Sequence, residues 1–397
     1  MKPYDFHLHI ENAKNWESKT GRVLGKLSDW NCGRFDPETP VSLLEEAFTY
    51  AVETFTTYTE TSITLQLGDA ILADLHSNPE SCFNANSALH LYGNATQALF
   101  ASIYAIRESV QNLKFLVVHP SYYANHDSLK ALQVPYHEYW RTLSVNGHVD
   151  LNNLRLFKEK NEFNAILITD PMYSTGIELT DENLKEILDF AETHDIWIII
   201  DSSFSGLSWE NPKKRWLDFI KIGRNGYKKC LVVDSPSKRL FTNNLKIGMV
   251  HCDKSVSHHL EKFSDSFVGN ITGIQHNFFK RVFIQANKEK IEAICTNNTR
   301  KIIDNYEYLL SIAHGSSHIY FIRPDAGFHT MIFFKGLQTG TFNSMSFCEG
   351  LVNQGVFALP TNDYYYASSD PFGVRINLIN SPRKWERLIR QFAEKGI

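Results

Sequence analysis

Four short apolar runs in the middle of the chain place the tightest limits on its fold. Each run is four or five residues long, and each is followed at once by an Asp or a His. Runs this short and this continuously apolar are typical of strands buried on both faces, as in a parallel sheet covered by helices. They cover residues 115–118, 165–169, 196–200 and 230–233. The sequence therefore predicts an α/β fold with a largely parallel sheet.

A helical pattern connects the second and third runs. Thr180 is a suitable N-cap, and acidic residues follow it in the first turn. From Leu184 to Ala191, apolar residues recur every three or four positions, which gives one face of a helix an apolar stripe. Strand, helix and strand together predict a right-handed βαβ unit.

The length of 397 residues favours one large and one smaller domain. A long helical stretch around residues 275–312 is placed to link them, and strands at 331–334 and 374–378 predict a mixed α/β module after it. We predict three parts: an N-terminal segment associated with the small domain (1–45), a large domain with a mainly parallel mixed sheet flanked by helices (46–275), and a smaller α/β C-terminal domain (276–397).

Composition narrows the class of protein. Hydrophobic residues make up 43% of the chain, charged residues 21%, and the formal net charge is −4, which argues against binding to nucleic acid or an anionic membrane. The six cysteines include no C-x-x-C pair, so we expect neither a zinc site nor a disulfide framework, and no metal. There is no signal-peptide core and no apolar run near the roughly 20 residues that cross a bilayer. We expect a soluble, cytoplasmic protein.

Polar or aromatic side chains come just after the predicted strands. Tyr122, Asp170, Asp201 and Lys238 each follow one of the four runs. Open α/β sheets bind ligands at the carboxyl ends of their strands. These four residues are therefore candidates for one binding site at that edge, although the ring of Tyr122 is equally suited to simple packing.

Lys238 and Asp201 have the chemistry of a carbonyl-cofactor site. Lys238 ends a Ser-Pro-Ser-Lys stretch that begins at Ser235, and Lys246 follows eight residues later. Burial or a nearby cation lowers the pKa of a lysine enough to make it a nucleophile, while hydroxyls and cations suit a phosphate. A carboxylate at the end of a buried strand needs a cation, which a protonated pyridine nitrogen supplies. The simpler alternatives are a solvated surface lysine and an Asp that caps a turn.

Two further motifs suit charged ligands. Residues 92–99 lead into an apolar helix, and the first N–H groups of that helix, at Ala95 and Thr96, are available to an anion. A helix start with only a structural role fits this motif as well. Arg375 lies inside an apolar strand, so it needs a partner, either the carboxylate of a ligand or an internal Asp or Glu.

Taken in order, these motifs resemble those of the fold type I pyridoxal-phosphate enzymes, and specifically a divergent member of the class I and II aminotransferase family. The resemblance extends from about residue 40 to the C-terminus. It implies the aspartate-aminotransferase-like fold, pyridoxal 5′-phosphate as cofactor, an amino acid as substrate, and a homodimer with shared active sites.

The resemblance also implies roles for single residues. Lys238 corresponds to the Schiff-base lysine that also moves a proton, Asp201 to the partner of the pyridine nitrogen, and Tyr122 to the aromatic residue stacked on the ring. Arg375 holds the substrate α-carboxylate, and the segment around Gly33 folds over the substrate. The phosphate is held by residues from several parts of the chain: Ala95, Thr96, Ser235, Lys246 and, from the neighbouring subunit, Tyr58.

Three positions depart from the family pattern. Asp170 replaces an Asn that donates to the phenolic oxygen of the cofactor, and Phe204 replaces a Tyr that bonds the same oxygen. Two lost hydrogen bonds of roughly 1 kcal/mol each shift the pKa of the cofactor imine by about a unit. Lys246 replaces an Arg of the phosphate site, which removes the bidentate fork. The pattern indicates a specialised member of the family.

Three functions remain under consideration. The first is an aminotransferase that acts through a Lys238 Schiff base. The second is a specialised enzyme of natural-product biosynthesis that uses the same cofactor for cyclisation, elimination, replacement or oxidation of an amino acid such as an arginine derivative, as Asp170 and Phe204 suggest. The third is a ligand-sensing module of a transcriptional regulator, which the net charge and the short segment before residue 40 disfavour. The sequence does not identify the substrate.

Overall fold

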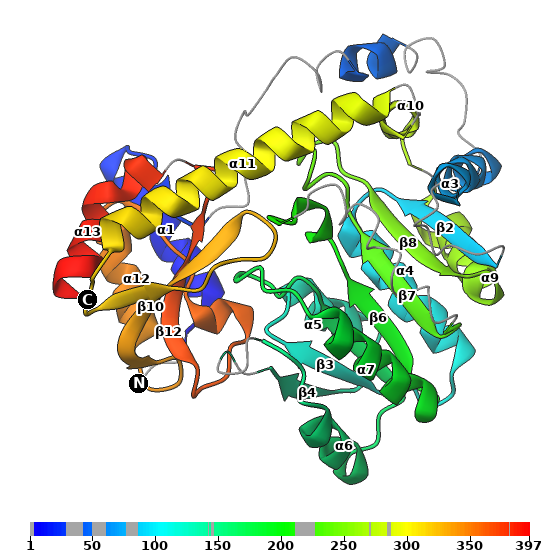
Figure 1. Ribbon diagram of the computed structural model, residues 1–397, viewed down its shortest axis with the longest axis horizontal. Coiled ribbons are helices and arrows are strands. Elements are labelled where there is room, and N and C mark those ends of the chain that lie inside the picture. The colour runs from blue at the N-terminus through cyan, green and yellow to red at the C-terminus, as the bar shows by residue number, and fades with distance from the viewer. Residues whose placement is uncertain are drawn as a thin grey trace.

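A mixed sheet of seven strands forms the middle of the structure (Figure 1). The computed structural model describes residues 4–28, 43–49, 61–76, 86–141, 143, 147–210, 227–269, 271–283, 287–380 and 382–397. In spatial order the strands are β2 (Ser87–Tyr92), β8 (Gly248–Asp253), β7 (Cys230–Asp234), β6 (Trp197–Asp201), β5 (Ala165–Thr169), β3 (Phe115–His119) and β4 (Tyr136–Trp140). From β7 to β4 all neighbours are parallel, whereas β8 is antiparallel to both β7 and β2. The predicted α/β class with a mainly parallel sheet is confirmed.

The four predicted strands correspond to β7, β6, β5 and β3. The structure adds β4 at one edge of the sheet and the antiparallel pair of β8 and β2 at the other. The sequence of β4, Tyr-His-Glu-Tyr-Trp, contains no apolar run, because most of this edge strand is only half-buried or exposed. Edge strands need less apolar sequence than central ones, so β4 is harder to recognise.

Helices cover both faces of this sheet, and successive strand residues point to opposite faces. Ile166 and Ile198 belong to one buried core, and their chain neighbours Leu167 and Ile199 belong to the other. Helices that supply side chains to the first core include α3 (Thr61–His76), α6 (Leu151–Lys160) and α7 (Asp181–Thr193). Those that supply the second core are α4 (Ala95–Ser109), α5 (Tyr123–Ala131) and α9 (Lys254–Phe263).

Side-chain caps fix where two of these helices begin. The Thr180 hydroxyl accepts a hydrogen bond of 3.2 Å from the Asn183 N–H, as its place before the apolar stripe predicts. The Asn94 side chain accepts one of 2.9 Å from the Gln97 N–H and so starts α4 at Ala95. Only two residues separate the end of β2 from the start of α4.

The C-terminal part contains a smaller antiparallel sheet in the order β12-β10-β9. The predicted strands at 331–334 and 374–378 fall on β10 and β12. The elements of this part are β9 (Ile319–Phe321), β10 (His329–Gln338), α12 (Ser344–Asn353), β11 (Val356–Phe357), the short helix η6 (Thr361–Tyr364), β12 (Pro371–Asn377), the short helix η7 (Pro382–Trp385) and α13 (Glu386–Lys395).

The described N-terminal residues pack on the C-terminal part. Helix α1 (Phe6–Thr20) lies against α12, and the short strand β1 (Gly25–Lys26) pairs in parallel with β11. Figure 1 shows α1, in blue, among the orange and red elements of the chain's other end. Nε2 of His9 is 3.0 Å from the carbonyl oxygen of Ala358. The domain boundaries at residues 45 and 275 stay predictions.

The expected helical stretch of 275–312 is two helices. Helix α10 (Gly273–Val282) ends before α11 (Lys288–Ala313) begins. The side-chain amide of Asn287 donates to the carbonyl oxygen of Arg281 over 2.8 Å, and so satisfies one carbonyl that the end of α10 leaves open. Figure 1 shows α11 spanning from the large sheet to the C-terminal part. Among the described residues no helix is both long and apolar enough to cross a membrane, α11 included.

Gly248 allows β8 to start directly against the N-terminus of α4, and this contact generates a testable prediction. A Cβ atom at Gly248 would lie 2.2 Å from the Asn94 carbonyl oxygen and 2.8 Å from the Ala95 nitrogen, both of them backbone atoms. We expect Gly248→Ala to lower the free energy of unfolding by about 1–3 kcal/mol, as overpacking does. The urea midpoint of the far-UV circular dichroism signal measures the effect.

Gly273→Ala is the matched control. Nothing lies within 4 Å of a Cβ at Gly273, and this residue opens α10. Alanine should leave stability unchanged or raise it by up to about 1 kcal/mol. Equal midpoints for the two variants would contradict the proposed close contact at Gly248.

Candidate active site

One cavity brings most of the predicted site residues together. It lies beyond the carboxyl ends of β6 and β7, beside the start of α4, and is partly open to solvent. The predicted residues that line it are Ala95, Thr96, Tyr122, Asp201, Phe204, Ser235, Lys238 and Lys246. Two further predicted residues, Gly33 and Tyr58, lie outside the described residues, so their roles stay predictions.

Asp201 provides a buried carboxylate in this cavity. It is the last residue of β6, and its side chain is 8% exposed. The carboxylate accepts a 2.6 Å hydrogen bond from the Ser203 hydroxyl and a 3.3 Å one from the Ser203 N–H. Burial nevertheless raises the pKa of Asp201, since these bonds and the charge of Lys238 only partly offset the loss of water. A cation at this point would stabilise the ionised carboxylate.

Lys238 reaches the same cavity from a turn after β7. Its N–H donates to the Ser235 carbonyl oxygen over 3.2 Å. The Ser237 hydroxyl accepts a 3.0 Å hydrogen bond from the Ile247 N–H, which ties this turn to the segment leading into β8. Nζ of Lys238 lies 5.6 Å from the centre of the Phe204 ring. The amine and the Asp201 carboxylate therefore face one space from neighbouring parallel strands.

The part of the cavity next to the start of α4 suits an anion. The first N–H groups of α4 have no carbonyl within the helix to bind, and the helix dipole adds positive potential there. Ala95 and Thr96, which begin α4, line the cavity, and so do Ser235 and Lys246. The Ser235 hydroxyl donates to the Ile247 carbonyl oxygen over 2.8 Å, so it must turn away from that carbonyl before it can donate to a bound anion.

Tyr122 forms part of the aromatic wall. It precedes α5, and its ring centre lies 4.3 Å from that of Tyr123 and 5.2 Å from that of Tyr173. Burial raises the pKa of Tyr122 far above its ordinary value, so the phenol stays neutral. A neutral ring held by its neighbours is suited to stacking against a flat ligand.

Asp170 and Phe204 provide no hydrogen-bond donor to the cavity. Phe204 lines it with an apolar ring, whereas Asp170 is absent from the lining. The Asp170 carboxylate accepts a 2.8 Å hydrogen bond from the Leu179 N–H, and its charge raises the pKa of the buried Arg141 against the effect of desolvation. The cofactor role expected for Asp170 stays a prediction.

Arg375 is completely buried next to the cavity and does not line it. Its Nη2 donates to the Ser28 carbonyl oxygen over 2.8 Å, and its Nη1 lies 3.5 Å from the Tyr173 hydroxyl. The guanidinium carbon lies 4.9 Å from the centre of the Tyr364 ring. Because Tyr173 itself lines the cavity, it connects Arg375 to that space.

Several residues that line the cavity were not candidates from the sequence. They include Tyr173, Ser203 and Asn243. Tyr173 lies three residues after Asp170, in a stretch from which the sequence suggested only Asp170 as a site residue. The signal for Ser203 is its position two residues after Asp201, where a hydroxyl can reach back to a strand-end carboxylate.

A buried ion pair joins Arg239, the residue after Lys238, to Asp234 at the end of β7. Nη2 of Arg239 lies 2.9 Å from Oδ2 of Asp234, and both residues are almost fully buried. Asp234 ends β7, and its negative charge contributes to the raised pKa of Asp201. Arg239 thus compensates the charge of Asp234, while Asp201 remains the buried carboxylate that faces the cavity.

Comparison with known proteins identifies the class to which this fold belongs. One similar solved structure is an aspartate aminotransferase from Thermus thermophilus with maleate, with 18% sequence identity and a TM-score of 0.77 over 99% of this chain and 97% of that one. An alanine aminotransferase from Pyrococcus furiosus has 17% identity and a TM-score of 0.79 over 98% of this chain and 95% of that one. An aminotransferase from Mycobacterium tuberculosis has 17% identity and a TM-score of 0.79 over 99% of this chain and 96% of that one. At these identities the likeness establishes the aspartate-aminotransferase-like fold.

The family follows from the sequence match. The model of the class I and II aminotransferases matches residues 27–392, so this chain belongs to that family of pyridoxal-phosphate-dependent transferases. No curated protein sequence matches the chain. The predicted family, fold and enzyme class are confirmed.

The buried carboxylate of Asp201 predicts how stability depends on pH. Its folded pKa is raised above the unfolded value, so the stability that it contributes is present at low pH and is lost as pH rises through the folded pKa. Asn does not ionise. In protein free of cofactor, Asp201→Asn should therefore be more stable than wild type at pH 7, and the difference should shrink as pH falls. Thermal midpoints at several pH values measure it.

Asp189→Asn is the control, because it removes an exposed carboxylate from α7. It should show no comparable stabilisation at pH 7. A less stable Asp201→Asn variant under these conditions would mean that the carboxylate is already fully compensated in the free protein.

Proposed function

We propose that this protein is an aminotransferase that binds pyridoxal 5′-phosphate through Lys238 and exchanges the amino group of an amino acid. The observation that carries the proposal is the meeting of Lys238 and Asp201 in one cavity that also contains the start of α4. The donor set fits the cofactor, since it combines an amine, a buried carboxylate, an aromatic wall and an anion site. When bound, the cofactor supplies an electron sink for the charge that develops at the substrate Cα.

Each group of residues would hold a different part of the cofactor. Ala95 and Thr96 at the start of α4 bind the phosphate, together with Ser235 and Lys246, which line the same cavity. Tyr122 stacks on the ring. Asp201 pairs with the ring nitrogen and keeps it protonated, which in turn compensates the buried carboxylate.

Lys238 has two tasks in this scheme. Its Nζ would hold the cofactor through the aldehyde carbon, and as a free amine it would move a proton at the substrate Cα. The Phe204 ring forms an apolar wall 5.6 Å from this nitrogen. The neutral amine is the form that can act as nucleophile or base.

Substrate recognition is proposed to involve Arg375. This guanidinium would bind the α-carboxylate, with the Tyr173 hydroxyl between it and the cavity. The segment around Gly33 would fold over the substrate, and Tyr58 would reach the phosphate bound by the neighbouring subunit of a homodimer.

We further propose a cytoplasmic location and the division into residues 1–45, 46–275 and 276–397.

Substitution of Lys238 tests the proposal directly. After incubation with the cofactor and reduction by borohydride, wild type should carry the cofactor mass on the peptide that contains Lys238, and Lys238→Ala should not. Amino-group transfer should fall by at least the roughly 10²–10⁴-fold that general acid–base catalysis supplies. The exposed Lys228→Ala variant is the control and should match wild type. Labelling on another lysine would exclude the proposed role.

A second candidate is a specialised enzyme of natural-product biosynthesis that uses the same cofactor for cyclisation, elimination, replacement or oxidation. The specific observation in its favour is the cavity wall where a cofactor oxygen would lie. Phe204 contributes only an apolar ring there, and the Asp170 carboxylate is bonded to the Leu179 N–H. Without those donors, the balance between reaction outcomes differs from that of an ordinary aminotransferase.

An amino-acid panel separates the two candidates. Aspartate-like, aromatic and arginine-like amino acids are incubated with the cofactor-loaded enzyme, with and without pyruvate or 2-oxoglutarate. An aminotransferase should give multiple turnovers only when the keto acid is present, because the amino group must leave the cofactor again. Turnover of an arginine-like substrate without any keto acid would favour the second candidate. Product masses identify the reaction.

A further inference from the structure

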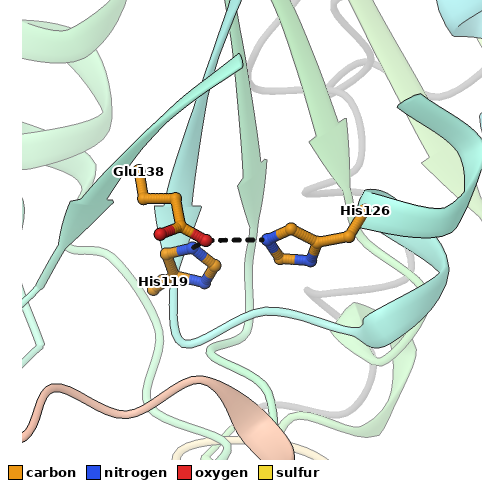
Figure 2. Close-up of side chains that lie close together, drawn as sticks. All are labelled: His119, His126 and Glu138. Atoms are coloured by element: carbon orange, nitrogen blue, oxygen red, sulfur yellow. Dashed lines mark ion pairs between the residues drawn. The ribbon is translucent and has the colours of Figure 1, made fainter. Parts of the chain in front are cut away.

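Two histidines and a glutamate from three elements meet outside the cavity. His119 ends β3, His126 lies within α5, and Glu138 lies in β4. Oε1 of Glu138 is 3.5 Å from Nε2 of His119 and 3.5 Å from Nε2 of His126. Figure 2 shows the two imidazole rings turned toward this one carboxylate. None of the three residues lines the proposed active-site cavity.

Three of the four imidazole nitrogens in this cluster are buried without a hydrogen-bond partner among the described residues. His119 is 0% and His126 is 1% exposed. Within the described part of the chain, Nε2 of His119 and both ring nitrogens of His126 have no hydrogen-bond partner. Buried polar atoms are nearly always paired in proteins, so three such nitrogens in one cluster indicate a missing partner.

Burial disfavours the charged form of both imidazoles, because each ring is almost completely covered. A neutral imidazole has one nitrogen lone pair that can act as a ligand, and here a carboxylate oxygen lies beside both rings.

The surrounding side chains hold the rings in place. Oγ of Ser121 lies 3.2 Å from Nδ1 of His119 and so orients that ring with Nε2 toward Glu138. The Tyr365 ring lies nearly parallel to both imidazoles, with centroid distances of 4.2 Å to His126 and 5.3 Å to His119. The Trp140 indole donates to the Tyr365 carbonyl oxygen over 3.2 Å and packs on His119.

We propose that His119, His126 and Glu138 bind one divalent transition-metal ion. Two imidazole nitrogens and one carboxylate oxygen form a ligand set typical of zinc, and their donor atoms lie within 4.8 Å of one another. Zinc prefers four ligands, and water completes the set. A metal ion can reach the site from solvent past Glu138, because the side chain of Glu138 is 38% exposed while both histidines are covered.

Such an ion would brace the segment that carries Tyr122. The chain leaves β3 at His119, passes Tyr122, enters α5 and reaches His126 there. Metal ligation would therefore fix both ends of the short segment from which Tyr122 enters the cavity, and would join it to β4. This consequence rests on the proposed function, whereas metal binding itself does not.

The test is zinc binding by the full-length protein after treatment with a chelator. Calorimetric titration and metal analysis should give one tightly bound zinc per chain in wild type. Glu138→Gln and His126→Gln should weaken binding roughly a hundredfold or more, because each removes a direct ligand. Glu138 is partly exposed, so its variant is expected to fold normally, as circular dichroism can verify.

His258 and His259 supply the matched control. These neighbouring histidines on α9 have ring centroids 3.7 Å apart, and they are the evident competitors for loosely bound metal. The double variant His258→Gln, His259→Gln should keep the tight site. Cobalt(II) in place of zinc should give the visible absorption of a four-coordinate ion in this control and none in Glu138→Gln.

Two results would overturn the proposal. One is a control variant that takes up no zinc, and the other is a folded Glu138→Gln variant that binds zinc as tightly as wild type. Neither result bears on covalent labelling of Lys238, so failure of the metal site and failure of the proposed function can be told apart.

Discussion

Burial of the Asp201 carboxylate at the end of β6 is the constraint on which the site depends. A charge removed from water must be compensated nearby, and burial raises the pKa of this carboxyl even with Ser203 and Lys238 beside it. The neighbouring carboxylate of Asp234 is already paired with Arg239. Lys238 offsets the burial of Asp201 only in part, and a protonated pyridine nitrogen of a bound cofactor would add a second cation next to this carboxylate.

The parallel sheet explains why the complementary groups lie together. In the pairing of β6 with its neighbours, Asp201 lies opposite Thr169 of β5 and Val233 of β7. All these strands point the same way, so whatever follows them collects at one edge of the sheet. The antiparallel β8 then brings Gly248 against the first turn of α4, and the absence of a side chain there allows the start of α4 to lie directly against β8.

The geometry of the parallel sheet also explains which of these residues could be predicted from the sequence. Lys238, Asp201 and Tyr122 could be predicted because each follows a continuous apolar run, and a parallel sheet brings such positions to one edge. Tyr173 gave no comparable signal, since its place in the cavity depends on how a turn folds against the C-terminal part. The helix break near Asn287 depends on one side-chain hydrogen bond. The cluster of His119, His126 and Glu138 could not be predicted, because its residues come from a central strand, a helix and an edge strand with no regular spacing between them.

The run of three tyrosines at 364–366 shows how one short segment can serve two sites. Tyr365 has a left-handed backbone conformation with φ of 59°, which turns its side chain away from those of its neighbours. Tyr364 packs on Arg375, whereas Tyr365 covers the two histidines, and neither ring belongs to an open surface patch. A non-glycine residue persists in this conformation only where its surroundings hold it there. The arginine proposed to bind the substrate and the cluster proposed to bind metal are thus contacted by adjacent residues of one short segment.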